Sequence, residues 1–303
     1  MSRLAAKIGV GLCLWVFATG CLSFQPAPLP GEPEQASYME LSQARVRYLD
    51  RGKGSPVVFL HGFGSSIEAW AEVLPKIRKK HRVIALDLKG FGWSGRPEGD
   101  YSPEAQAKLV FELLDELGVD ETAVVAHSWG SSVALKMALM QSDRIRRLAL
   151  YGSWVYAAQL PSSFYWARAK GIGEAMYGLF YDQLPNEKLA AAFYDRSELT
   201  QEYVDYVKKL LGRPGTTAAA LAAVRGQHYE TLQKKYSTIE QPTLLLWGRE
   251  DNVAHLRYGE RLVRDLPNAE LKVYPRCGHF PMKEATESST RDLAAFLNSE
   301  EGR

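Results

Sequence analysis

The amino-acid sequence predicts an α/β protein with a mostly parallel central sheet flanked by helices. Short apolar runs of strand length alternate with amphipathic stretches of helix length over most of the chain. Helices that alternate with buried strands act as crossovers, and they produce a parallel sheet that is covered on both faces. Between residues 153 and 237 the alternation stops, and helical patterns rich in alanine and aromatic residues replace it. We therefore expect a core formed by residues 37–152 and 238–303, with a helical cap over residues 153–237.

Residues 1–20 have the layout of a secretory signal peptide. Arg3 and Lys7 supply positive charge, and an apolar run from Ile8 to Ala18 follows before a few small residues. The run is too short to span a bilayer comfortably. We therefore expect an exported protein, with a retained hydrophobic anchor as the alternative interpretation.

Residues 18–21, Ala-Thr-Gly-Cys, resemble a bacterial lipobox, although the lipobox pattern usually has a larger aliphatic residue than Ala18. The resemblance implies that Cys21 is lipidated and anchors the protein to a membrane of the bacterial cell envelope. Leu22 after the cysteine favours the outer membrane. Residues 21–36 are rich in proline and lack periodicity, so they predict an extended tether between the anchor and the core.

The composition indicates which partners to expect. The 303 residues are 46% hydrophobic and 24% charged, which is ordinary for a globular protein. Without Arg3 and Lys7, 35 basic residues balance 35 acidic ones, and no basic block predicts a nucleic-acid partner. Cys277 is the only cysteine after residue 21, so no intramolecular disulfide is expected. Histidine, cysteine and acidic residues show no metal-ligand spacing, and we expect neither a metal nor a cofactor.

The core elements follow one another in the order that a parallel sheet requires. The first two strands are short and paired, and each later strand is a buried apolar run joined to the next by a helix. The expected strands cover residues 37–41, 44–50, 56–62, 82–88, 121–127, 146–152, 242–248 and 269–275. The expected helices cover residues 68–79, 103–117, the stretch after residue 128, 256–266 and 284–298. In such sheets, ligands bind outside the carboxyl ends of the strands.

The stretch Ala126-His127-Ser128-Trp129-Gly130 connects an expected strand to an expected helix. It resembles the G-x-S-x-G nucleophile elbow of the α/β-hydrolase family, with alanine at the first glycine position. Small residues at both ends let the strand and the helix approach closely while the turn exposes the serine. The resemblance implies that Ser128 is a nucleophile. The other interpretation is a structural serine at a buried strand-to-helix junction.

A serine nucleophile needs a base that removes its proton. Of the six histidines, only His279 lies in the loop between the last strand and the last helix, where the α/β-hydrolase family places its triad histidine. The neighbouring His127 is expected to be a packing group or a contact of the triad.

The imidazole in turn needs a carboxylate that fixes its tautomer. Gly248-Arg249-Glu250-Asp251 follows a buried strand and resembles the family's G-x-x-D acid position at Asp251, with Glu250 as the adjacent alternative. The chain order Ser128, Asp251, His279 is the order expected for this family.

Two further segments fit the resemblance. His61-Gly62-Phe63-Gly64 follows an expected strand and resembles the oxyanion loop of these enzymes. By that resemblance, the backbone N–H groups of Phe63 and Trp129 form the oxyanion hole. Residues 87–94 resemble the D-x-x-G-x-G-x-S segment of the family, and we expect a structural role for them beside the oxyanion loop.

Serine at the nucleophile position favours acyl transfer, whereas the family's dehalogenases and epoxide hydrolases use aspartate there. We expect hydrolysis of carboxylic esters through a Ser-His-Asp acyl-enzyme mechanism, with a small-molecule acyl substrate that carries an apolar moiety. For any single cap aromatic, packing of the cap's own helices onto the core is the expected role. As a group, the cap aromatics favour an apolar substrate moiety and could line an apolar acyl pocket. They are Trp154, Tyr156, Phe164, Tyr165, Trp166, Tyr177, Phe180 and Tyr181.

Three different functions also fit the sequence. A proline iminopeptidase-like enzyme would need acidic groups for the substrate amine, and Glu174, Asp182 and Glu187 are available in the cap. A carbon–carbon bond hydrolase would use the same triad. A non-catalytic binding lipoprotein of the envelope would keep the fold alone.

Overall fold

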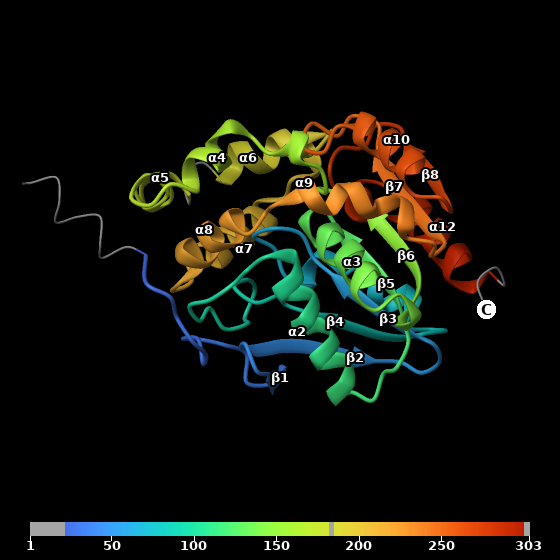
Figure 1. Ribbon diagram of the computed structural model, residues 1–303, viewed down its shortest axis with the longest axis horizontal. Helices are drawn as coiled ribbons and strands as arrows, with labels where there is room; N and C mark the ends of the chain where they lie inside the picture. Colours follow the sequence, from blue (N-terminus) through green and yellow to red (C-terminus); the bar gives the residue numbers. More distant parts are fainter. Residues whose placement is uncertain (1–21, 182–184, 300–303) are drawn as a thin grey trace, which may run out of the picture.

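A computed structural model of the chain describes residues 22–181 and 185–299, and its centre is an eight-stranded sheet (Figure 1). The strand order is β1-β2-β4-β3-β5-β6-β7-β8. Strand β2 runs antiparallel to both of its neighbours, and every pair from β4 to β8 is parallel. The predicted fold class, a mostly parallel sheet flanked by helices, is confirmed.

All the expected strands are present, with ends that differ by a few residues. They are β1 (Ser37–Glu40), β2 (Arg45–Arg51), β3 (Pro56–Leu60), β4 (Arg82–Leu86), β5 (Thr122–His127), β6 (Ile145–Tyr151), β7 (Thr243–Gly248) and β8 (Ala269–Tyr274). The helices of the core are η1 (Ile67–Trp70), α1 (Leu74–Ile77), α2 (Pro103–Glu116), α3 (Trp129–Met140), η2 (Ser142–Arg144), α10 (Leu256–Asp265), α11 (Pro281–Glu284) and α12 (Thr286–Asn298).

The central strands are apolar at successive positions because helices cover both faces of the sheet. All six residues of β5 are buried. Val124 and Ala126 belong to the core cluster that includes residues of α2 and α3, whereas Ala123 and Val125 belong to the cluster that includes residues of α1 and α12. Successive side chains of a strand point to opposite faces, so each strand contributes to both clusters.

The prediction of a single helix over residues 68–79 is wrong. The chain forms η1 and α1 instead, two short helices separated by residues 71–73. Pro75 has no backbone N–H to donate to residue 71, so a continuous helix would lose a hydrogen bond at this point. The last expected helix, over residues 284–298, is confirmed as α12, and the short helix α11 precedes it.

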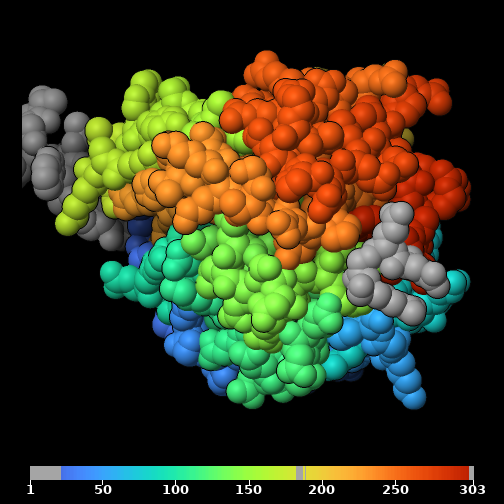
Figure 2. All heavy atoms as spheres, turned by 45° about the vertical axis from the view of Figure 1, so that its right-hand side comes forward, coloured from blue at the N-terminus to red at the C-terminus, as the bar shows by residue number. Residues whose placement is uncertain are grey.

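Helices and irregular connections, with no strand, form the described part of the segment between β6 and β7. It contains η3 (Ala157–Gln159), α4 (Ser162–Ala167), α5 (Ile172–Phe180), α6 (Pro185–Ala192), η4 (Arg196–Glu198), α7 (Gln201–Leu211), α8 (Thr216–Arg225), α9 (Tyr229–Leu232) and η5 (Gln233–Thr238). Figure 1 shows α4 to α8 together on one side of the core. In the space-filling view, this part of the chain, coloured yellow-green to orange, lies against the red C-terminal part (Figure 2).

Residues 22–36 differ from the extended tether that was expected, because they lie on the core. Gln25 and Arg96 exchange backbone hydrogen bonds of 2.9 and 2.8 Å, and the Phe24 ring stacks on Tyr101. Leu29 is buried, and the Glu32 carboxylate pairs with Arg45 at 2.6 Å. The burial of Leu29 and this ion pair hold residues 22–36 against the core, although their sequence has no periodicity.

Cys21 and residues 1–20 lie outside the described residues, so the signal peptide and the lipidation stay predictions. In the part of the chain that the structure does describe, no helix has both the length and the apolarity needed to cross a membrane.

Asp87, directly after β4, joins three segments that support the predicted oxyanion loop. Its buried carboxylate accepts hydrogen bonds from the backbone N–H groups of Ile67 (2.8 Å) and Trp93 (2.7 Å). It also pairs with Arg47 of β2 at 3.3 Å. A Cβ at Gly92 would lie 2.1 Å from the Asp87 carboxyl group, so only glycine fits at that position. These contacts support the structural role expected for residues 87–94.

We expect Asp87→Ala to lower the free energy of unfolding by about 3–5 kcal/mol, because it leaves the N–H groups of Ile67 and Trp93 without their acceptor and removes one of the two carboxylates that pair with Arg47. Urea unfolding followed by circular dichroism measures this. The matched control is Asp50→Ala, which breaks the partly exposed pair with Arg82 (2.7 Å) and should cost about 1 kcal/mol or less. Similar losses in the two variants would contradict the role of Asp87.

Candidate active site

Ser128 occupies a strained turn between β5 and α3. Its backbone has φ 52° and ψ −121°, and Arg276 is the only other described non-glycine residue with positive φ. Such a conformation costs roughly 1–3 kcal/mol and persists only where the surroundings enforce it. Here the Ser128 N–H donates to the Tyr151 carbonyl (2.9 Å), and its carbonyl accepts from the Trp154 N–H (3.1 Å). The turn is therefore held from β6 and from the residues that follow it.

Close backbone packing explains the glycine two residues after the serine. A Cβ at Gly130 would lie 2.5 Å from the His61 carbonyl oxygen, so α3 can approach the end of β3 only with glycine there. Ala126, at the first glycine position of the motif, is fully buried in β5. The local sequence thus permits the sharp strand-to-helix reversal that the motif predicted.

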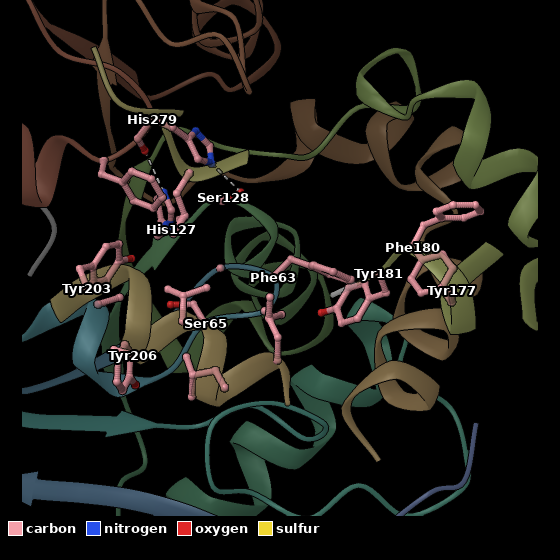
Figure 3. Close-up of a pocket in the computed structure, with 18 of the residues that line it drawn as sticks. Phe63, Ser65, His127, Ser128, Tyr177, Phe180, Tyr181, Tyr203, Tyr206 and His279 are labelled. Carbon is pink, nitrogen blue, oxygen red and sulfur yellow. Dashed lines mark hydrogen bonds between the residues drawn. The ribbon is translucent and has the colours of Figure 1, made fainter. Parts of the chain in front are cut away.

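Ser128 lies beside His279 (Figure 3), and His279 in turn contacts Asp251. The distance from Ser128 Oγ to His279 Nε2 is 3.0 Å, and the distance from His279 Nδ1 to Asp251 Oδ2 is 2.8 Å. A carboxylate can only accept, so Nδ1 carries the proton and Nε2 presents a lone pair to the serine hydroxyl. This is the arrangement in which an imidazole can act as a general base toward serine.

The carboxylate that contacts His279 belongs to Asp251, and the neighbouring Glu250 has a different contact. Asp251 is buried, and its Oδ1 accepts from the backbone N–H groups of Val253 (2.8 Å) and Ala254 (2.7 Å). These two bonds orient the carboxylate so that Oδ2 faces the imidazole. Glu250 instead accepts from the Cys277 N–H at 3.1 Å.

The His279 loop is also held by the cap. The His279 N–H donates to the carbonyl of Ala192, the last residue of α6, at 2.7 Å. A Cβ at Gly278 would lie 2.3 Å from the same carbonyl oxygen, so the close approach of α6 requires glycine. The cap therefore contacts the predicted triad directly.

His127 is a buried contact of the triad, in agreement with the expectation from the sequence. Its Nε2–H donates to the His279 carbonyl at 2.9 Å, and the two imidazole rings lie 4.7 Å apart. Burial, together with the charge that His279 would carry, lowers the pKa of His127 well below its usual value, so this ring stays neutral. It orients the loop without competing for the serine proton.

The backbone N–H groups of Phe63 and Trp129 lie at the two segments predicted for the oxyanion hole. Neither has an acceptor among the residues described, and that of Trp129 is an unsatisfied donor at the start of α3. His61 fixes the loop, because its Nδ1–H donates to the Gly62 carbonyl (2.7 Å) while its Nε2 accepts from the Leu88 N–H (3.0 Å). Burial lowers the pKa of His61 and keeps this pattern intact.

A cavity of about 530 Å³ opens beside Ser128 between the core and the cap. Its walls are mostly aromatic and aliphatic, with a few uncharged polar groups (Figure 3). They comprise Gly62, Phe63, Gly64, Ser65, Ala69, His127, Ser128, Ser163, Phe164, Met176, Tyr177, Phe180, Tyr181, Leu189, Tyr203, Tyr206, Val207, Leu210, Leu211, His279 and Phe280. We call this cavity the large chamber.

Four of the eight cap aromatics that could line an acyl pocket do line this cavity. Phe164, Tyr177, Phe180 and Tyr181 line the large chamber. Trp154 lines a separate, smaller cavity. The other three lie elsewhere: Tyr156 is buried against Asp265, and Tyr165 and Trp166 are exposed.

Sequence reasoning missed the contribution of α7 to the chamber. Tyr203, Tyr206, Val207 and Leu210 line it from one face of that helix. Their spacing of three, one and three residues is that of a helical stripe, which was the available signal. The stripe alone does not indicate whether it faces a cavity or the core.

Two of the three acidic residues considered for an amine site, Glu174 and Glu187, are described, and neither lines the large chamber. Glu174 pairs with Arg225 at 2.8 Å and caps α5, and Glu187 is absent from the described walls of the large chamber. Asp182 lies outside the described residues. Within the described ranges, no group of three or more histidine, cysteine, aspartate or glutamate side chains could hold a metal ion.

Comparison with known proteins identifies the family. The model of the alpha/beta hydrolase fold family matches residues 55–286, which include all three residues of the predicted triad. The chain belongs to the alpha/beta hydrolase fold family. It is therefore a hydrolase by family, and the resemblance indicated by the motifs is confirmed at this level.

Relatives with named activities cover most of the chain. A 2-hydroxy-6-oxo-2,4-heptadienoate hydrolase of Pseudomonas putida is 31% identical over 264 residues, which is 83% of this chain and 92% of that protein. The solved meta-cleavage product hydrolase of Pseudomonas fluorescens IP01 is 27% identical with a TM-score of 0.73, over 86% of this chain and 97% of that one. An N-acyl homoserine lactone degrading enzyme is 25% identical with a TM-score of 0.72, over 86% of this chain and 100% of that one.

We expect Gly62→Ala to lower kcat about a hundredfold, which is the usual cost of losing one oxyanion donor. A Cβ at this position would lie 2.9 Å from His127 Nδ1 and 3.1 Å from Ser128 Cβ, so the segment that carries the Phe63 N–H must shift. Steady-state hydrolysis of an activated ester measures the change. The control is Gly118→Ala after α2, where the added methyl group meets open space but φ +64° strains the alanine, so this variant should lose stability and keep kcat. A Gly62→Ala enzyme with unchanged kcat would contradict the placement of the oxyanion hole.

Proposed function

We propose that this protein is a serine hydrolase of carboxylic esters whose acid part is apolar. The observation that carries the proposal is the large chamber, which opens at Ser128 and whose described walls contain no lysine, arginine, aspartate or glutamate. Burying an apolar chain there contributes about 0.8 kcal/mol per methylene group. The chamber thus suits a neutral, apolar acyl group.

The geometry supports a two-step acyl-enzyme mechanism. Ser128 Oγ attacks the ester carbonyl while His279 Nε2 takes the hydroxyl proton, and Asp251 stabilises the imidazolium that forms. The N–H groups of Phe63 and Trp129 donate to the oxyanion of the tetrahedral intermediate. His279 then gives the proton to the departing alcohol. In the second step His279 activates water, which releases the acid and restores Ser128.

A relative in the structural comparison supports the ester chemistry. The N-acyl homoserine lactone degrading enzyme acts on a lactone, which is a cyclic ester, according to its name. It shares this fold over 86% of the present chain. Ester cleavage is thus compatible with the architecture at this level of similarity.

Carbon–carbon bond hydrolysis is the second candidate, and the relatives with named activities favour it over ester hydrolysis. The heptadienoate hydrolase and the meta-cleavage product hydrolase cleave such bonds within this family. The chamber argues in the other direction, because a dienoate carries a carboxylate. A carboxylate buried without a cation pays a large desolvation cost, and the described walls offer no cation. Arg276 and Lys283, the two cations nearest in sequence to His279, are absent from those walls, and Lys283 contacts the ring of Tyr203 instead (4.6 Å to its centre).

An aminopeptidase and a non-catalytic binding protein have less support from the site. An aminopeptidase would need an acidic group for the substrate amine, and none lines the described part of the large chamber. A non-catalytic binding protein would not require the strained serine turn or the two hydrogen bonds that join Ser128, His279 and Asp251.

We expect the enzyme to hydrolyse p-nitrophenyl esters, with kcat/KM rising from acetate to longer acids as each methylene group enters the chamber, until the chamber is full. Ser128→Ala should lower kcat by about 10⁴ or more, since its hydroxyl is the nucleophile. Ser131→Ala is the matched control, because this buried serine lies one helical turn away and its Oγ has no partner in the described chain. A Ser128→Ala enzyme as active as the control would exclude the mechanism.

The two candidates differ in the expected substrate preference. We expect kcat/KM for p-nitrophenyl octanoate to exceed that for 2-hydroxy-6-oxo-2,4-heptadienoate by at least about tenfold, since the described walls supply no charge for the carboxylate. The dienoate assay follows the loss of substrate absorbance, and Ser128→Ala serves as its blank. The opposite preference would establish carbon–carbon bond hydrolysis in place of ester hydrolysis.

A further inference from the structure

Ser128 and His279 line two cavities. Besides the large chamber, a second cavity of about 250 Å³ also reaches both side chains. Its remaining walls include Trp154 after β6, Val253 beyond β7 and Gln227 after α8. We call this cavity the small chamber. A reacting carbonyl at Ser128 can therefore extend one substituent into each chamber.

Gln227 is the polar side chain that distinguishes the small chamber from the large one. Only 1% of Gln227 is exposed. Its Oε1 accepts from Trp154 Nε1 at 3.2 Å and from the Tyr229 hydroxyl at 3.1 Å. The indole N–H of Trp154 can only donate, so the atom that faces it must be the oxygen, and the orientation of the amide is fixed.

This orientation leaves the Gln227 amide nitrogen as the group available to a ligand. The backbone groups of Gln227 are already used, since its N–H donates to Val224 (3.2 Å) and its carbonyl accepts from Arg168 (2.6 Å). Nε2 has no acceptor in the described part of the chain. It is also not one of the fully buried side-chain atoms that lack a hydrogen-bond partner, so it keeps some exposed surface. A donor without a partner in a largely buried site costs about 1–3 kcal/mol unless water or a ligand accepts from it.

We propose that the small chamber binds the alcohol part of the ester and that Gln227 Nε2 donates a hydrogen bond to an acceptor oxygen in it. The apolar acid chain gains most in the large chamber, which leaves the small chamber for the group that departs as an alcohol. The substrate class is an ester of an apolar acid with a short alcohol that carries an ether or carbonyl oxygen. This inference rests on the proposed ester hydrolysis.

A pair of isosteric esters tests the proposal. 2-Methoxyethyl octanoate and butyl octanoate have alcohol parts of the same length, and one CH₂ of the butyl chain is an oxygen in the other. We expect the wild type to show a kcat/KM about three- to tenfold higher for the methoxyethyl ester, the usual effect of one added hydrogen bond. Equal values for the two esters would overturn the proposal while leaving ester hydrolysis established.

Two variants assign the preference to Gln227. Gln227→Glu keeps the oxygen that accepts from Trp154 and Tyr229, and a second carboxylate oxygen takes the place of the NH₂ donor. Gln227→Met keeps the size of the side chain but removes both the amide oxygen and the amide nitrogen. Assays of the glutamate variant at about pH 9 keep its buried carboxyl ionised. We expect the ratio of kcat/KM for the methoxyethyl ester to that for the butyl ester to fall to about one in both variants, whatever their absolute activity. A preference that persists in a folded variant would contradict the role of Gln227.

Covalent labelling keeps the test independent of ester turnover. Octylphosphonofluoridates that carry a 2-methoxyethoxy or a butoxy group react with an activated serine and place the same two groups beside it. We expect faster labelling of Ser128 by the methoxyethoxy reagent in the wild type and equal rates in Gln227→Glu. If neither octanoate ester is hydrolysed but this difference in labelling rate is found, the small-chamber site stands and the proposed ester function fails. Equal rates in the wild type overturn the site.

Discussion

The backbone conformation of Ser128, with φ 52°, is the constraint on which the rest of the site depends. A non-glycine residue adopts this conformation only where neighbouring contacts enforce it. Hydrogen bonds to Tyr151 and Trp154 hold the turn, and the absence of a side chain at Gly130 lets α3 start against the carbonyl of His61. The same packing places the first N–H of α3 beside the oxyanion loop. The strained turn thus brings the nucleophile and the predicted oxyanion donors together.

The cap is connected to the rest of the site by polar contacts as well as by apolar packing. Ala192 of α6 accepts a hydrogen bond from the His279 N–H, so the position of the predicted base depends on the cap. Tyr206 of α7 donates to Glu68 at 2.8 Å, and Glu68 pairs with Arg47 at 2.7 Å. Burial favours the neutral form of Glu68, but the hydrogen bond and charge of Arg47 outweigh it and lower the pKa of Glu68 to about 2. The ion pair therefore persists at neutral pH beneath the large chamber.

The sequence was sufficient for the fold and for the residues of the candidate triad, because each is marked by a local pattern. Apolar runs predicted the strands, and Ser128, Asp251 and His279 each follow a strand that ends at the same edge of the sheet. The walls of the chambers were harder to predict, since the packing of α4 to α8 decides which face of each helix meets a cavity. Trp166 and Tyr181 are both cap aromatics, yet the first is exposed and the second lines the large chamber. The contacts that orient Gln227 were also hard to predict, because Trp154 is distant from it in sequence and Tyr229 belongs to no motif.

The most direct test of the proposed mechanism is a crystal structure of the protein after reaction with an alkyl fluorophosphonate, whose phosphorus mimics the tetrahedral intermediate. We expect a bond from phosphorus to Ser128 Oγ and a phosphoryl oxygen about 2.7–3.1 Å from the backbone nitrogens of Phe63 and Trp129. We also expect the alkyl chain to lie in the large chamber. A folded protein that does not react at Ser128, or a phosphoryl oxygen directed away from both nitrogens, would contradict the central claim.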